Sequence, residues 1–125
     1  MRKVRFWWFV AAWAVVIFLL SSIPGKAMPQ VPALQYDKVL HALVYSVLGG
    51  LFFLALRQAS SLTTARLVVA AGLFALGYGL TDELHQVFVP GRSADLYDAL
   101  ADGIGGLLGA TIATRLPFAR SGAPG

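Results

Sequence analysis

Eighteen consecutive residues near the start of the chain, from Phe6 to Ile23, carry no charged side chain. Three further apolar stretches follow, at about residues 39–56, 67–89 and 96–116. Each approaches the roughly 20 residues that a helix needs to cross about 30 Å of hydrocarbon. Together they fill most of the 125 residues and leave no segment for a water-soluble domain. We therefore predict an all-α protein, a four-transmembrane-helix bundle that forms a single domain over residues 1–125.

The composition supports the same class and excludes several functions. Hydrophobic residues make up 58% of the chain and charged residues only 13%, which is typical of a membrane protein. The absence of cysteine excludes a disulfide framework, a thiol nucleophile and a cysteine-ligated zinc. The net charge of +4 does not indicate nucleic-acid binding, because the basic residues are dispersed at the ends of the apolar stretches. The sequence identifies no cofactor.

The basic residues predict the topology. We expect the first apolar run to remain as a span rather than a cleaved signal peptide, because it is long and contains Trp7, Trp8 and Trp13. With four spans the termini share a side, and seven of the ten basic residues lie on it: Arg2, Lys3, Arg5, Arg57, Arg66, Arg115 and Arg120. Only Lys26, Lys38 and Arg92 lie opposite. The positive-inside rule then predicts cytoplasmic termini and a multi-pass protein of the cytoplasmic membrane.

All six acidic residues fall in the outer half of this topology. Asp37 precedes the second stretch, and the other five surround the join between the third and fourth: Asp82, Glu83, Asp95, Asp98 and Asp102. A charge near the bilayer centre costs about 2.5–3.5 kcal/mol on insertion scales, so such residues usually face a bundle interior or a partner. We therefore predict one polar site that opens away from the cytoplasm.

Helical spacing places these polar residues on shared faces. Asp37, His41 and Tyr45 are four apart in turn, as are Asp82 and Gln86, and Asp95, Asp98 and Asp102 follow a three-four spacing. With a third helix ending near Val89, Asp82 would lie about 10 Å inside the helix end. Small residues at Gly105 and Gly109 are interpreted as helix-packing positions.

Three segments carry a family resemblance. They are Asp37 to Tyr45 (DKVLHALVY), Asp82 to Arg92 (DELHQVFVPGR), and the pattern Asp95-x-x-Asp98-x-x-x-Asp102-x-x-Gly105-x-x-x-Gly109. This ordered set resembles the VanZ-like family of small bacterial integral membrane proteins. The resemblance implies a role at the cell envelope, since the namesake is associated with resistance to the glycopeptide teicoplanin, while no general biochemical activity is established. Asp102 departs from the family pattern, in which Asn is more frequent.

One hypothesis is an enzyme acting on a lipid-linked or cell-envelope substrate. His41 would share acid–base work with Asp82 or Glu83, and the Arg92 guanidinium would hold an anionic head group. The remaining substrate-binding candidates are Gln86, Tyr45, Lys38, Asp37, Asp98 and Asp102. No residue is identified as a nucleophile.

Other interpretations stay open. A non-catalytic protein would use the same residues to bind a lipid, a cell-wall precursor or a glycopeptide within the bilayer. A divalent cation would find ligands in Asp82, Glu83, His41 and Asp98, but their spacing matches no recognised metal motif and no metal ligand is assigned. A structural network is the simplest alternative: Asp37 and Asp95 would cap helices, Lys38 would anchor a helix end at the head groups, and Asp98 and Asp102 would pair with Arg92 or Lys38.

Overall fold

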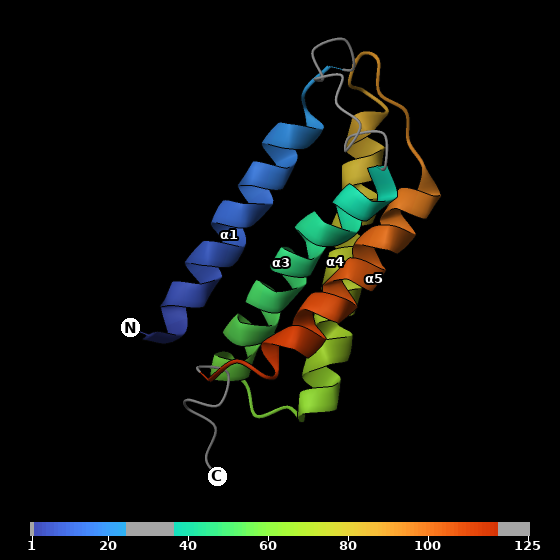
Figure 1. The fold of residues 1–125 in the computed structure, drawn as a ribbon. Coiled ribbons are helices and arrows are strands. Elements are labelled where there is room, and N and C mark those ends of the chain that lie inside the picture. The colour runs from blue at the N-terminus through green and yellow to red at the C-terminus, as the bar shows by residue number, and fades with distance from the viewer. Residues whose placement is uncertain (1, 25–36, 118–125) are drawn as a thin grey trace.

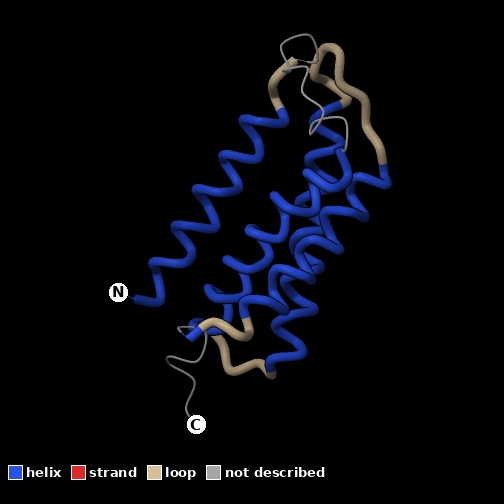
Figure 2. Tube along the Cα trace, viewed as in Figure 1, coloured by secondary structure: helices blue, strands red, loops and turns tan. Residues whose placement is uncertain are grey.

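The computed structural model describes residues 2–24 and 37–117. Within these residues the chain forms four helices and no strand: α1 (Arg2–Ser21), α3 (Asp37–Ala59), α4 (Thr64–Gln86) and α5 (Leu96–Ala113) (Figures 1 and 2). Each helix coincides with one of the predicted apolar stretches to within a few residues. The predicted all-α class is therefore confirmed.

The third predicted stretch ends earlier than expected, and this changes the depth of its acids. α4 begins after Thr63, whose side chain accepts a hydrogen bond from the backbone N–H of Arg66. It ends at Gln86, and the next N–H groups bond carbonyls three residues back, in a tighter turn that leads to Pro90. Asp82 consequently lies about 6 Å from the helix end, rather than the predicted 10 Å.

The helices run alternately up and down. The first turn of α1, the α3–α4 connection and the last turn of α5 lie at one end of the bundle, and the α4–α5 connection lies at the other (Figure 1). α5 packs extensively against α3 and α4, whereas α1 lies mainly against α3. Two long-range hydrogen bonds fasten α1: Trp13 Nε1 donates to Val44 O (2.9 Å) and the Tyr78 hydroxyl donates to Ala14 O (2.6 Å).

Glycines allow the close approach of α3 and α5. A Cβ atom added at Gly105 would collide with the backbone of Ala42, and one added at Gly109 would collide with the backbone of Ser46. Gly49 on α3 faces the backbone of Gly106 in the same way. The interpretation of Gly105 and Gly109 as packing positions is confirmed, because no larger residue fits at this contact.

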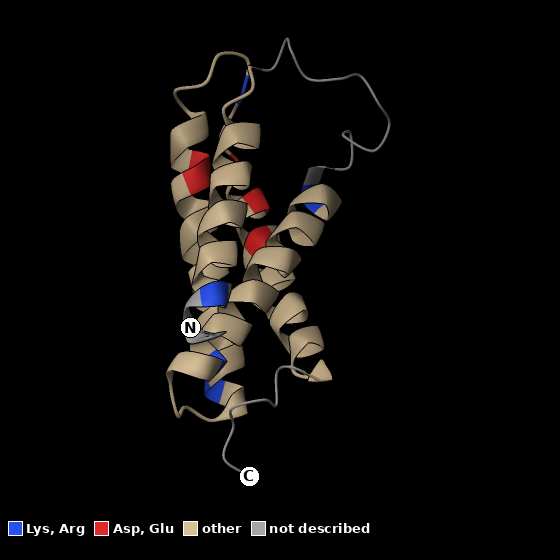
Figure 3. Cartoon of the chain, turned by 90° about the vertical axis from the view of Figure 1, so that its left-hand side faces the viewer, with Lys and Arg blue, Asp and Glu red and all other residues tan. Residues whose placement is uncertain are grey.

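The two ends of the α3–α4–α5 unit have different interiors. At the end near the α3–α4 connection, a wholly apolar cluster is buried: Phe53, Leu54, Leu67, Ala71, Ala110 and Ala113. The acidic residues lie in the opposite half of the bundle (Figure 3). The polar residues are thus gathered at the end of the bundle that carries the α4–α5 connection.

In the part of the chain that the structure describes, two helices are long and apolar enough to cross a membrane: Lys38–Ala59 of α3 and Thr64–Gln86 of α4. α1 contributes a shorter apolar segment, Arg5–Ser21. Many large hydrophobic side chains are also exposed on the outside of the bundle, including Phe18, Leu43, Leu73 and Ile112. Length, composition and this apolar exterior indicate a membrane protein.

Candidate functional site

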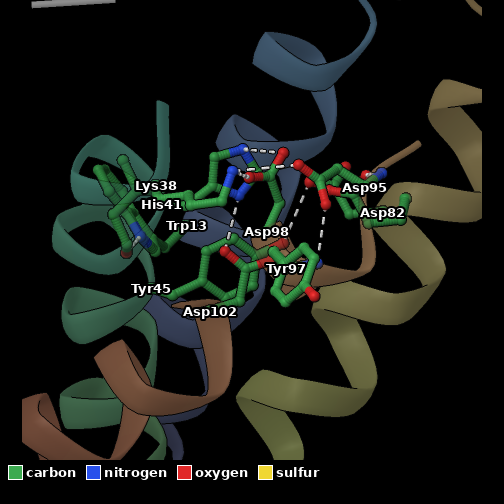
Figure 4. Close-up of polar contacts among 11 residues, drawn as sticks. Trp13, Lys38, His41, Tyr45, Asp82, Asp95, Tyr97, Asp98 and Asp102 are labelled. Carbon is green, nitrogen blue, oxygen red and sulfur yellow. Dashed lines mark hydrogen bonds and ion pairs between the residues drawn. The ribbon is translucent and has the colours of Figure 1, made fainter. Parts of the chain in front are cut away.

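His41 occupies the centre of the polar end, between two helices. Its Nδ1 lies 2.7 Å from Oδ1 of Asp102, a residue of α5 that is completely buried. Its Nε2 lies 3.9 Å from Oδ2 of Asp98, one turn earlier on α5. The imidazole therefore has a carboxylate near each nitrogen, and these contacts orient the ring (Figure 4).

Lys38 and Asp95 form the solvent-facing edge of this network. Lys38 Nζ donates to Asp95 Oδ2 at 3.1 Å and lies 3.5 Å from Asp98 Oδ1 (Figure 4). Asp95 is also the N-cap of α5, where its Oδ1 accepts the backbone N–H of Tyr97 at 2.9 Å. The Lys38 hydrogen bond, reinforced by the Tyr97 N–H, holds the pKa of Asp95 below its usual value.

Two neighbouring acids on α4 have different partners. Asp82 accepts a hydrogen bond from the buried Tyr45 hydroxyl at 3.2 Å. Glu83 Oε2 accepts the backbone N–H of Asp95 at 2.7 Å, which ties α4 to the start of α5. Glu83 Oε1 is buried and has no hydrogen-bond partner among the described residues. A buried oxygen without a hydrogen-bond partner lowers the stability of the fold unless a ligand, water or ion satisfies it.

A cavity of about 130 Å³ lies beside His41, between α1, α3 and α4. One part of its wall is apolar and is formed by Ile17, Leu20, Ile23, Leu40 and Val44. The other part is polar and is formed by Ser21, His41, Tyr45, Asp82, Gln86 and Arg92. The cavity thus presents hydrogen-bond donors and acceptors next to an apolar surface.

Arg92 and Ser21 lie at the polar wall of this cavity and differ in their hydrogen bonds. Arg92 Nη1 donates to the backbone carbonyl of Ile23 at 2.9 Å, so it links the α4–α5 connection to the segment after α1. Ser21 is buried, and its hydroxyl has no hydrogen-bond partner among the described residues. Ser21 therefore offers a donor and an acceptor to a molecule in the cavity.

Three of the polar side chains are close enough to share a cation. One ligand atom each from His41, Glu83 and Asp102 lies within 4.8 Å of the other two. The set differs from the one expected from the sequence, because Asp102 takes the place of Asp82 and Asp98. Asp82 is instead bonded to Tyr45 on the side of the cavity.

The structure thus divides the predicted site residues into two adjoining groups. His41, Tyr45, Asp82, Gln86 and Arg92 line the cavity. Beyond His41 lies a network formed by Lys38, Glu83, Asp95, Asp98 and Asp102. The side chain of Asp37 lies outside the described residues. His41 belongs to both groups, since it lines the cavity and contacts Asp98 and Asp102.

The observed contacts can be compared with the structural roles that the sequence suggested for the same side chains. Asp95 caps α5 as expected, and Lys38 forms ion pairs in addition to any contact with head groups. Asp98 pairs with Lys38 as expected, whereas Asp102 contacts His41. The relative depths of α3 and α5 select these partners.

Sequence reasoning missed the contribution of α1 to the site. Ser21 lines the cavity, and Ser22 Oγ lies 2.9 Å from His85 Nε2, whose ring stacks on Phe18. The paired serines at the end of the first apolar run were the available signal. Their spacing does not reveal which helix they face, so their place in the site came from the structure.

Comparisons with known proteins give a family but no characterised function. The model of the VanZ/LLP1 family matches residues 6–117. An uncharacterised protein of the fission yeast Schizosaccharomyces pombe is 33% identical over 111 residues, which cover 86% of this chain and 61% of that protein. The chain thus spans about three fifths of that relative's length. No solved structure shows a significant match to the chain.

Proposed function

Because the chain belongs to the VanZ/LLP1 family, we propose that it is a multi-pass membrane protein that binds the head group of an anionic amphiphile. In this proposal all four helices span the cytoplasmic membrane with both termini in the cytoplasm. The apolar exterior of the bundle supports the arrangement. The distribution of basic residues supports the orientation, since Arg57, Arg66 and Arg115 lie at the end of the bundle where α1 begins and α5 ends. In the predicted topology, seven of the ten basic residues fall on that side.

The single observation that carries the binding proposal is the mixed wall of the cavity beside His41. Arg92 and Gln86 supply donors to an anionic or polar head group, and the Ser21 hydroxyl adds a further donor. Leu20 and Leu40 supply an apolar surface along which a hydrocarbon chain can lie. An amphiphile has both parts, so this wall matches it better than it matches a wholly polar solute.

The size of the cavity narrows the ligand class. Its volume of about 130 Å³ is smaller than the roughly 300–1,000 Å³ of sites that enclose a drug-sized ligand. We infer that the cavity takes the head group and the adjoining part of a hydrocarbon chain, while the rest of the amphiphile remains in the bilayer. A complete glycopeptide is larger than the cavity and would contact it only in part. The relative in a yeast favours a membrane lipid over a bacterial wall precursor.

Native mass spectrometry of the purified full chain tests this proposal. The protein is extracted with its membrane lipids, and binding is then measured with added anionic phospholipid, lipid-linked wall precursor and teicoplanin. We expect one retained anionic lipid in the wild type and at least tenfold weaker binding in Arg92→Ala. Because Arg92 also bonds Ile23 O, Arg92→Lys serves as a second variant that keeps the charge but loses the guanidinium fork.

The matched control is Arg66→Ala, which removes an exposed arginine at the opposite end of α4. It lowers the net charge by the same amount, so its lipid binding should equal that of the wild type. Equal binding by wild type, Arg66→Ala and Arg92→Ala would contradict the head-group site. Retention of precursor or teicoplanin, rather than phospholipid, would keep the site and change its ligand.

A catalytic role is a second candidate, supported by the contact between His41 and Asp102. A carboxylate bonded to one imidazole nitrogen, with the ring at a cavity wall, is an arrangement suited to general acid–base catalysis. The enzyme hypothesis predicts turnover of the bound amphiphile that His41→Gln abolishes while binding remains. Incubation of the wild type with the retained lipid, followed by product analysis, distinguishes this role from simple binding.

A further inference from the structure

The polar end holds more negative than positive charge, and this imbalance is independent of the cavity ligand. Four carboxylates are at least nine-tenths buried there: Asp82, Glu83, Asp98 and Asp102. Among the described residues, the permanent cations at this end are Lys38 and Arg92, and the Lys38 side chain is 54% exposed. Buried charge in a membrane is costly unless it is paired, so the site favours an additional cation or bound protons.

The positions of three side chains provide a place for that cation. His41 on α3, Glu83 on α4 and Asp102 on α5 each bring one ligand atom to within 4.8 Å of the others. Atoms bound to one metal ion at about 2.0–2.2 Å lie no more than roughly 4.4 Å apart, so a small closing movement suffices. Gly79, one turn before Glu83, makes room on α4 for the Asp102 carboxyl group. The helix packing therefore directs Asp102 toward Glu83.

The Glu83 carboxylate is held with one oxygen available. Its Oε2 accepts the Asp95 backbone N–H at 2.7 Å, which fixes the group between α4 and α5. Its Oε1 is buried without a hydrogen-bond partner among the described residues. A bound cation is one of the few ways to satisfy such an oxygen.

We propose that His41, Glu83 and Asp102 bind one divalent cation of the Mn²⁺ or Zn²⁺ kind. An imidazole with two carboxylates suits these ions, whereas Ca²⁺ and Mg²⁺ prefer oxygen ligands alone. The His41 ring is also oriented as metal-binding histidines usually are, with a carboxylate beside the nitrogen that does not bind the ion. If Nε2 binds the ion, Nδ1 lies beside Asp102, and if Nδ1 binds it, Nε2 lies near Asp98. The ion bridges α3, α4 and α5 at the end where apolar packing gives way to acids.

Metal binding by the purified full chain tests the site directly. After treatment with a chelator, the protein is dialysed against Mn²⁺, Zn²⁺, Mg²⁺ or Ca²⁺, and bound metal is measured by mass spectrometry of the elements. We expect one Mn²⁺ or Zn²⁺ per chain, a higher melting temperature with metal, and at least tenfold weaker Mg²⁺ and Ca²⁺ binding. Glu83→Gln preserves the size of the side chain and the acceptor for Asp95, and should weaken Mn²⁺ and Zn²⁺ binding at least tenfold.

Asp82→Asn is the matched control, because it removes a buried carboxylate from the preceding position that contacts Tyr45 instead. Its metal stoichiometry should remain one per chain. Equal losses in Glu83→Gln and Asp82→Asn would overturn the site and indicate diffuse attraction by negative charge. Absence of stoichiometric Mn²⁺ or Zn²⁺ in the folded wild type would also overturn it. These results do not depend on lipid retention, so the cation site and the amphiphile site are tested independently.

Discussion

The same three helices build two ends of opposite character. Near the α3–α4 connection, α3, α4 and α5 bury Phe53, Leu54 and Leu67 among small residues. Near the α4–α5 connection, the same helices bury four carboxylates around His41. The helices, their directions and their close contact are shared, so the difference lies in the side chains alone.

The two ends differ in the interactions that hold their buried side chains. Apolar side chains at the first end exclude water and carry no directional requirement. At the second end each acid depends on a particular partner, and a buried charge that loses its partner is strongly destabilising. A structure that only needed four packed helices would repeat the apolar solution. The buried acids at the polar end are what the proposed amphiphile and cation sites would use.

The contact between α3 and α5 serves both ends, so its disruption should have the largest effect. In Gly109→Leu the new side chain meets the backbone of Ser46, which cannot move without separating the helices. We expect a loss of stability beyond the roughly 3 kcal/mol of ordinary overpacking, with little folded protein in the membrane. Abundance and thermal unfolding measure the effect.

Gly77→Leu is the control for this substitution. A Cβ atom at Gly77 meets no atom within 4 Å, and the position is exposed on α4. Since leucine favours the helix over glycine by somewhat less than about 1 kcal/mol, this variant should accumulate at least as well as the wild type. Similar losses in both variants would show that the bundle tolerates no added side chain, whichever face receives it.

A pair of substitutions with similar cost distinguishes the two ends. Phe53→Ala removes a buried ring from the apolar end, at a cost of about 3–5 kcal/mol. Asp102→Ala removes the carboxylate that contacts His41 Nδ1, at a cost of about 3–5 kcal/mol. At an equal folded fraction, metal and lipid binding should persist in Phe53→Ala, and metal binding should be lost in Asp102→Ala. Loss of metal binding in both would mean that the two ends are not separable.

The sequence predicted the helices more fully than it predicted their partners. Apolar runs and the Asp95 cap mark the helices, because these signals are local. The end of α4 was missed, since it depends on the turn that precedes Pro90. Spacing placed Asp98 and Asp102 on one face of α5 but did not give its depth relative to α3. That depth decides that Asp102 meets His41. The packing of α1 against α3 and α4, which the sequence also did not give, brings Ser21 to the cavity.

A smaller effect is expected where the polar end loses one neutral donor. Tyr45→Phe removes the hydroxyl that donates to Asp82 at 3.2 Å and keeps the ring that is buried against α4. The free energy of unfolding should fall by about 1 kcal/mol, a typical value for one hydrogen bond. Metal binding should not change, because Asp82 lies outside the group of three ligands. Chemical denaturation with and without Mn²⁺ measures both quantities, and a lower metal affinity in Tyr45→Phe would place Asp82 among the ligands.

The smallest effect is expected at the exposed edge, where Asp95 pairs with Lys38. The pKa of Asp95 is lowered in the folded protein, so its carboxylate stabilises the fold above the unfolded pKa near 3.9. This contribution is lost as the pH falls through the lower folded value. The wild type should therefore be slightly more stable than Asp95→Asn at pH 7, and the two should converge below about pH 4. Melting temperatures from pH 7 to pH 3 measure the difference, with Lys38→Met as the second variant. A difference that persists unchanged to pH 3 would show that the charge of Asp95 is not its cause, since Asn also caps a helix.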